Sequence, residues 1–138
     1  MNAFERCLAE KRLVRVSPSP EMIKKEMESA DYDCGRAQDS LEEGDAKWAS
    51  IQAYYSIFHA SKALVLSKGY REKGHSCLLI ALRELFPAET VLANDLEMCM
   101  DLRHGADYAS TYDAGSAAIA VRKARESLER AGELLPGR

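Results

Sequence analysis

Residues 53–64 decide the fold of this chain and read Ala53-Tyr54-Tyr55-Ser56-Ile57-Phe58-His59-Ala60-Ser61-Lys62-Ala63-Leu64. Two stripes, both largely apolar, run along this region with the three- and four-residue spacing of a helix. They consist of Ala53, Ile57, Ala60 and Leu64, and of Tyr54, Phe58, Ser61 and Val65. Because apolar residues then cover much of the circumference, we expect a central helix over 45–68 that packs against several neighbours and ends at Gly69.

Four further segments in the domain show the same helical spacing. The clearest is 19–44, whose stripe consists of Ile23, Met27, Ala30, Cys34, Ala37 and Leu41. The other three are predicted over 75–86, 88–108 and 116–134. No segment alternates apolar and polar residues with period two, so we expect no sheet. Short connections between helices predict an all-α fold, an antiparallel up-and-down bundle of four or five helices.

The first residues of the chain are predicted to lie outside this bundle. Residues 1–16 have the pattern of a short helix through Phe4, Leu8 and Leu13. Two prolines, Pro18 and Pro20, then interrupt it, because proline lacks a backbone donor and restricts the residue before it. We therefore expect an N-terminal extension over 1–18, either an appendage or a swapped arm, and a bundle domain over 19–138.

Length and charge limit the classes of protein that the sequence can encode. A chain of 138 residues predicts one domain. A net charge of -3 and an isoelectric point near 5.7 argue against a generally basic nucleic-acid binder but allow a local basic groove. No apolar run approaches the ~20 residues of a membrane span, and the charged N-terminus lacks the apolar core of a signal peptide. We expect a cytoplasmic protein that does not enter the membrane.

The cysteines and histidines do not predict a metal site or a cofactor. No two of the four cysteines, Cys7, Cys34, Cys77 and Cys99, have the spacing of a zinc knuckle or a redox pair. We expect them to be small buried hydrophobic residues in a reducing cytosol. His59, in the middle of the central helix, is expected to bond to a neighbouring helix.

Three motifs follow one another at characteristic separations. Residues 53–60 carry the aromatic pair, 73–75 read Lys-Gly-His at the start of the third helix of the bundle, and the fourth contains Leu102-Arg103 followed by Ala106-Asp107-Tyr108. In this order, and in an all-helical chain, they resemble the HEPN superfamily of small prokaryotic helical domains. The resemblance covers about 19–135.

The resemblance implies a bundle that is usually homodimeric and often paired with a minimal nucleotidyltransferase, many members being toxins of toxin–antitoxin pairs. Many members are metal-independent ribonucleases, with an arginine followed after four to six residues by a histidine, and two copies meet across the dimer cleft. Arg103 matches that arginine. Tyr108 stands where the histidine would be in the shortest spacing, and His104 is adjacent to the arginine instead.

Arg103 occupies a position at which the helical pattern calls for an apolar residue. Its planar guanidinium binds phosphate oxygens in a bidentate way and stays charged. Asp107, four residues on, either forms an ordinary intrahelical ion pair with Arg103 or orients it towards an anion. Tyr108 is a poor base, but it can donate a hydrogen bond to phosphate or stack on a base. His104 could carry proton transfers in a ribonuclease.

Three further residues are candidates for nucleotide or RNA contacts. Tyr54 and Tyr55 point about 100° apart on a helix, so we expect one to fill the core and Tyr55 to reach the cleft. Lys73 lies in a small basic patch with Lys68 and Arg71. His75 either caps the third helix of the bundle with its ring or meets an anion at the positive end of that helix.

These observations predict a nucleotide- or RNA-binding protein, one component of a toxin–antitoxin or nucleotidyltransferase-linked pair, without the complete ribonuclease motif. Two alternatives remain open. The first is an active metal-independent endoribonuclease that uses Arg103 and His104 from each protomer. The second is a structural adaptor bundle that docks a partner protein.

Overall fold

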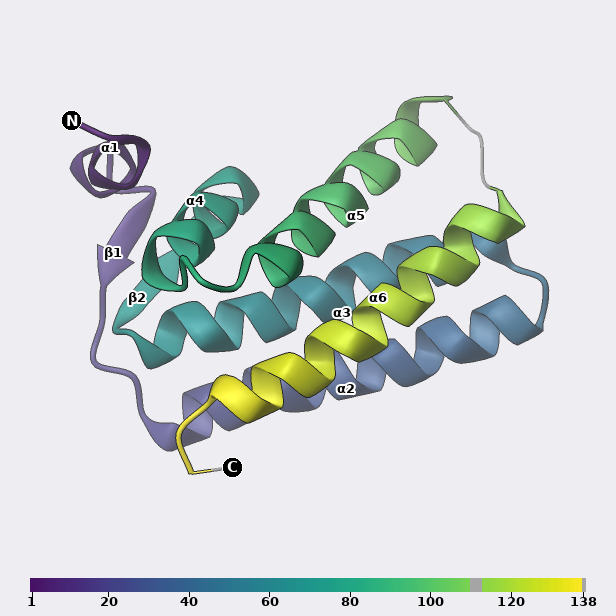
Figure 1. The fold of residues 1–138 in the computed structure, drawn as a ribbon, viewed down its shortest axis with the longest axis horizontal. Coiled ribbons are helices and arrows are strands. Elements are labelled where there is room, and N and C mark those ends of the chain that lie inside the picture. The colour runs from purple at the N-terminus through teal and green to yellow at the C-terminus, as the bar shows by residue number, and fades with distance from the viewer. Residues whose placement is uncertain (110–112, 138) are drawn as a thin grey trace.

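The computed structural model describes residues 1–109 and 113–137, with side chains described up to residue 102 and again from residue 113. Within this part of the chain the structure consists of helices and one small two-stranded sheet (Figure 1). The all-α class predicted from the sequence is confirmed. Over the same described ranges, no helix combines the length and the apolar character needed to cross a bilayer.

The central helix predicted from the sequence is α3 (Ala46–Ser67). It packs against α2 (Pro20–Glu42) and α6 (Ala114–Leu134), and also against α5 (Thr90–Ala109) and α4 (His75–Leu85). Figure 1 shows α2 and α3 lying side by side along most of their length. The other helices are therefore arranged around α3, as expected for a helix that is apolar on most of its circumference.

Local sequence signals set the ends of the two longest helices. The Ser19 hydroxyl accepts a hydrogen bond from the backbone N–H of Met22, and Pro20 occupies the first turn of α2. The Asp45 carboxylate accepts one from the N–H of Trp48 at 3.1 Å and begins α3. Gly69, with φ of 89°, follows the last turn of α3 in the left-handed conformation that glycine adopts at low cost.

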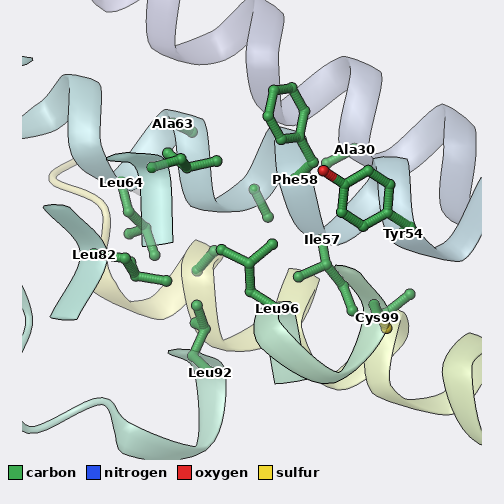
Figure 2. Packing of buried hydrophobic residues seen from close by; sticks show 14 of the residues in the cluster. Ala30, Tyr54, Ile57, Phe58, Ala63, Leu64, Leu82, Leu92, Leu96 and Cys99 are labelled. Carbon is green, nitrogen blue, oxygen red and sulfur yellow. The ribbon is translucent and has the colours of Figure 1, made fainter. Parts of the chain in front are cut away.

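The core is built around the buried side chains of α3. Ile57 and Leu64 are fully buried there, and Leu96 of α5 is fully buried against them. Figure 2 shows Ile57 and Leu96 close together, with Leu82 of α4 and Leu92 of α5 nearby. One tight apolar contact region therefore joins three helices, which fixes where α4 and α5 lie relative to α3.

The prediction that the chain contains no sheet is wrong. Strand β1 (Leu13–Arg15) pairs antiparallel with β2 (Tyr70–Glu72), with Leu13 opposite Glu72 and Arg15 opposite Tyr70. Each strand has only three residues, too few for an alternating pattern to be visible in the sequence. The pairing also joins segments more than fifty residues apart, so local signals do not reveal it.

The N-terminal segment folds onto its own chain at the end of the molecule that holds α4 (Figure 1). The predicted helix is shorter than expected: α1 (Ala3–Ala9) ends early, and Leu13 belongs to β1. A capping box between Asn2 and Glu5 begins α1. The segment thus contributes one short helix and one strand to the structure.

Two of the four cysteines form a disulfide, which corrects the expectation that all are reduced. The bond joins Cys7 of α1 to Cys77 of α4. The two residues are seventy positions apart, so only the tertiary structure brings them together. Cys34 and Cys99 are free and buried, as expected, and burial raises the pKa of the Cys99 thiol to about 12.

We predict that Ile57→Ala lowers the free energy of unfolding by about 2–5 kcal/mol, because it leaves a cavity at a fully buried position. Val91→Ala is the matched control, because Val91 is 68% exposed, and it should change that free energy by less than about 0.5 kcal/mol. Urea unfolding followed by circular dichroism measures both. Equal effects of the two substitutions would contradict the central place of α3.

Candidate functional site

The arginine motif predicted from the sequence belongs to the second half of α5. Arg103, His104, Asp107 and Tyr108 all fall within Thr90–Ala109. Their side chains lie outside the described residues. Their predicted roles as phosphate contact, proton carrier, orienting carboxylate and cleft tyrosine therefore stay predictions.

The other predicted residues lie near an aromatic cluster where α3 meets α4. The cluster consists of Tyr54, Tyr55 and Phe58 of α3 and His75 of α4. The Phe58 and His75 ring centroids are 4.6 Å apart, and those of Tyr54 and Tyr55 are 5.3 Å apart. Tyr55 and His75 are thus brought into one cluster, with Phe58 and Tyr54 contacting both.

The adjacent tyrosines point in different directions, as expected for neighbouring positions on a helix. Tyr54 is 1% exposed and fills the core, whereas Tyr55 is half-buried at the edge of the cluster. Tyr55 therefore presents part of its ring to the surface, where an aromatic face can stack on a nucleic-acid base.

His75 does not cap α4. It is the first residue of that helix, and Gly74 occupies the cap position without a side-chain hydrogen bond. The Nδ1 atom of His75 instead forms a hydrogen bond of 2.5 Å with the phenol oxygen of Tyr54. The imidazole is therefore held at the start of α4 by a buried group of α3, while the residue itself stays exposed.

Lys73 lies in the segment that leads from β2 into α4. Its side chain is exposed, and its backbone N–H donates a hydrogen bond of 2.9 Å to the carbonyl of Arg12. Of the predicted basic patch, Arg71 is also exposed, whereas the Lys68 ammonium lies over the Phe86 ring, 5.2 Å from its centroid. All three members of the patch are exposed, and Lys68 also contacts an aromatic ring.

A second cluster, which the sequence analysis did not identify, bridges α2 and α3. The His59 Nδ1 atom lies 3.2 Å from Oε2 of Glu26, and its Nε2 atom lies 3.8 Å from Oδ2 of Asp33. The Lys62 ammonium lies 4.0 Å from the same Glu26 carboxylate. The expected bond from His59 to a neighbouring helix is therefore present. The sequence could have indicated this cluster, because Glu26 and Asp33 are seven residues apart and therefore lie on the same face of a helix.

Glu72 of β2 is electrostatically coupled to two members of this cluster, Lys62 and Glu26. It is 9% exposed, and its Oε1 atom is buried with no hydrogen-bond partner among the described residues. Burial raises the pKa of Glu72, an effect that the nearby positive charge of Lys62 partly offsets. Burial likewise raises the pKa of Asp33, and the nearby His59 partly offsets that rise.

The two clusters share one face of the central helix. Tyr55, Phe58, His59 and Lys62 follow one another at the i, i+3, i+4 and i+7 positions of α3. The Lys62 ammonium lies 5.8 Å from the centroid of the Phe58 ring, so the charged and aromatic clusters meet there. We call these four residues the α3 face. It places aromatic rings beside the charged groups that bridge α2 and α3. Among the described residues, no group of three or more His, Cys, Asp or Glu is placed to hold a metal ion.

These features define a small all-α domain, arranged around one central helix whose single polar face carries aromatic and charged side chains. The HEPN domain family matches residues 23–136, which include α3 and α5. The chain therefore belongs to the HEPN family, a superfamily of nucleotide- and RNA-binding domains often found in toxin–antitoxin systems. This confirms the resemblance drawn from the three motifs.

One curated relative is similar over part of the chain. The UPF0332 protein PH1297 of Pyrococcus horikoshii is 39% identical over 57 residues. That segment covers 41% of this chain and 40% of the relative. The chain thus matches less than half the length of this relative.

We predict that Glu72→Gln raises the thermal midpoint at pH 7 relative to the wild type. A raised pKa means that the folded state binds the Glu72 proton more tightly than the unfolded state does. The contribution of Glu72 to stability therefore falls as pH rises from the ordinary value of 4.5 through the raised pKa. The advantage of the glutamine variant should disappear near pH 3.5, where glutamate is protonated in both states.

The matched control for this experiment is Glu84→Gln, because Glu84 is exposed on α4. Differential scanning calorimetry between about pH 3.5 and pH 8 follows both variants, and the control should track the wild type. If the Glu72→Gln and wild-type midpoints stay parallel at all pH values, burial of the Glu72 charge does not oppose folding.

Proposed function

We propose that this protein binds RNA or a nucleotide through Arg103 of α5, at a groove shared by two copies of the chain. The observation that carries the proposal is membership of the HEPN family over 23–136, a range that contains Arg103. A guanidinium at that point of the helical pattern supplies a permanent positive charge for phosphate. Asp107 orients it, and Tyr108 lines the same groove.

The α3 face supports this assignment with the chemistry of a base contact. Tyr55 is half-buried, and its ring belongs to the cluster that contains His75. Lys73 is exposed two residues before His75. We assign Tyr55 to stacking and Lys73 and His75 to phosphate or base contacts at the rim. Because the ligand then meets rings and cations together, single-stranded RNA fits better than a duplex.

Binding without efficient cleavage follows from the residue at position 108. Metal-free cleavage of RNA needs a group that takes the proton from the 2′-hydroxyl and another that protonates the leaving oxygen. Tyr108 occupies the place that the resemblance gives to histidine, and a phenol with a reference pKa of about 10 serves poorly as a base at neutral pH. His104 is the one histidine beside Arg103, and its participation would restore the nuclease alternative.

The proposed setting is a cytoplasmic homodimer that pairs with a nucleotidyltransferase in a toxin–antitoxin system. Family membership supports the pairing and the dimer, since HEPN domains often occur in such systems and often form dimers. The adaptor alternative, a bundle that only docks a partner protein, predicts no measurable affinity for RNA or nucleotide.

We predict that Arg103→Ala weakens binding of a short single-stranded RNA by about ten- to a hundredfold, because a charge-assisted hydrogen bond contributes about 1.5–3 kcal/mol. The dependence of log K on log salt should also become shallower by ~0.7 for each phosphate that the variant no longer neutralises. Arg122→Ala is the matched control, since Arg122 is exposed on α6. Isothermal calorimetry at several salt concentrations measures both effects.

Arg103→Lys separates charge from geometry in the same assay. Lysine keeps the positive charge but not the bidentate fork, so it should recover only part of the affinity. If Arg103→Ala binds RNA and nucleotides as the wild type does, or if the wild type binds neither, the proposed function fails and the adaptor alternative is favoured.

We predict that the wild-type protein, incubated with labelled single-stranded RNA in EDTA, yields no cleavage products that depend on Arg103. Denaturing gel electrophoresis of wild-type, Arg103→Ala and His104→Ala reactions provides the measurement. Cleavage that is present in the wild type and absent in both variants would show instead that Arg103 and His104 form a working ribonuclease site.

A further inference from the structure

The disulfide joins the part of the chain that precedes the HEPN match to the domain itself. Cys7 lies on α1, before residue 23 where the family match begins, and Cys77 lies in the first turn of α4. Both residues are fully buried. The bond is therefore the covalent link between the N-terminal extension and the helix that starts at His75.

The disulfide matters more for the attachment of α1 than for the attachment of β1, the strand that follows it. Helix α1 has seven residues, a length that is not stable alone in water. Cys7 is its one fully buried residue, while Phe4 adds an edge contact to the Tyr70 ring at 5.4 Å. By contrast, Leu13 of β1 is 1% exposed, and β1 is paired with β2 along its length. Cleavage of the bond should thus free residues 1–10 and leave β1 in place.

We propose that Cys7 and Cys77 form a reversible thiol–disulfide exchange site that locks α1 onto α4 when oxidised and releases it when a dithiol reduces the bond. One thiolate of the dithiol attacks a sulfur of the pair, giving a mixed disulfide and one protein thiolate. The second thiol of the reductant then displaces the other cysteine. Two electrons pass to the protein, each cysteine takes up a proton, and the dithiol becomes a cyclic disulfide.

The burial of the two cysteines also determines how a reductant reaches the bond. Because both sulfurs lie in fully buried residues, a reductant reaches them only after α1 has opened locally. The rate of reduction therefore depends on how often α1 opens. A cytosolic disulfide is typically transient and redox-sensing, which is the behaviour this site would show in the compartment proposed above.

The bond constrains the turn of α4 that carries His75. Cys77 and His75 are two positions apart, so their side chains point about 200° from one another around the helix. Cys77 contacts α1, while His75 contacts Tyr54 and Phe58 of α3. Since Gly74 provides no side-chain cap, the first turn of α4 is held between α1 and α3. Reduction removes one of these two attachments.

Limited trypsin digestion of the full chain tests the proposal. The segment freed by reduction contains a cleavage site at Arg6, and a second site, Lys11, follows it directly. The protein is compared as isolated without reductant and after incubation with dithiothreitol. Denatured samples should contain two free thiols in the first state and four in the second. Cleavage at these two sites should become at least about tenfold faster on reduction, while 13–138 stays resistant, and removal of dithiothreitol should restore protection.

Two variants accompany the wild-type comparison. Cys7→Ser should be cleaved at the fast rate whether or not dithiothreitol is present. Cys34→Ser removes a free buried thiol and should keep the redox response. The wild-type measurement alone decides the matter if a variant fails to fold.

Three results would overturn the proposal. The first is four free thiols in denatured protein that has been kept without reductant and exposed to air. The second is an equal rate of cleavage within 1–12 in the two redox states. The third is loss of the helical circular-dichroism signal of the whole chain on reduction, which would make the bond a structural element of the fold. None of these results depends on whether Arg103 binds RNA.

Discussion

The burial of α3 is the constraint on which the rest of this structure depends. Its apolar residues cover most of its circumference, so it must be enclosed by α2, α4, α5 and α6 to remove them from water. The packing of Ile57 near Leu96 and the burial of Tyr54 are local consequences of that requirement. Each neighbouring helix needs only one apolar stripe, because α3 supplies the opposing surface to all of them.

The same constraint concentrates polar chemistry on the α3 face. Tyr55, His59 and Lys62 are half-buried there between α2 and the junction of β2 with α4. Loss of hydration near this face is the main reason that the pKa of Glu72 is raised, and the positive charge of Lys62 offsets only part of that rise. The face thus pairs ring surface with charge, a combination suited to recognising nucleotides.

The N-terminal extension contacts the bundle near β2 and the start of α4. It adds β1 to β2, the strand that carries Glu72, and attaches α1 to the helix that carries His75. Both attachments lie within a few residues of side chains assigned to the proposed site. The HEPN match begins after most of the extension, at residue 23.

The sequence by itself determined the helices, the central position of α3 and the family, because helical periodicity, caps such as Ser19 and Asp45, and short motifs are all local. It also showed that only one of Tyr54 and Tyr55 could enter the core. Only the tertiary structure decided that β1 pairs with β2, that Cys7 bonds to Cys77, and that Glu72 joins the charges of α2 and α3. Those contacts join residues that are far apart in the chain. A residue pattern indicates which face of a helix or strand a side chain occupies, but it does not indicate which distant residue that side chain contacts.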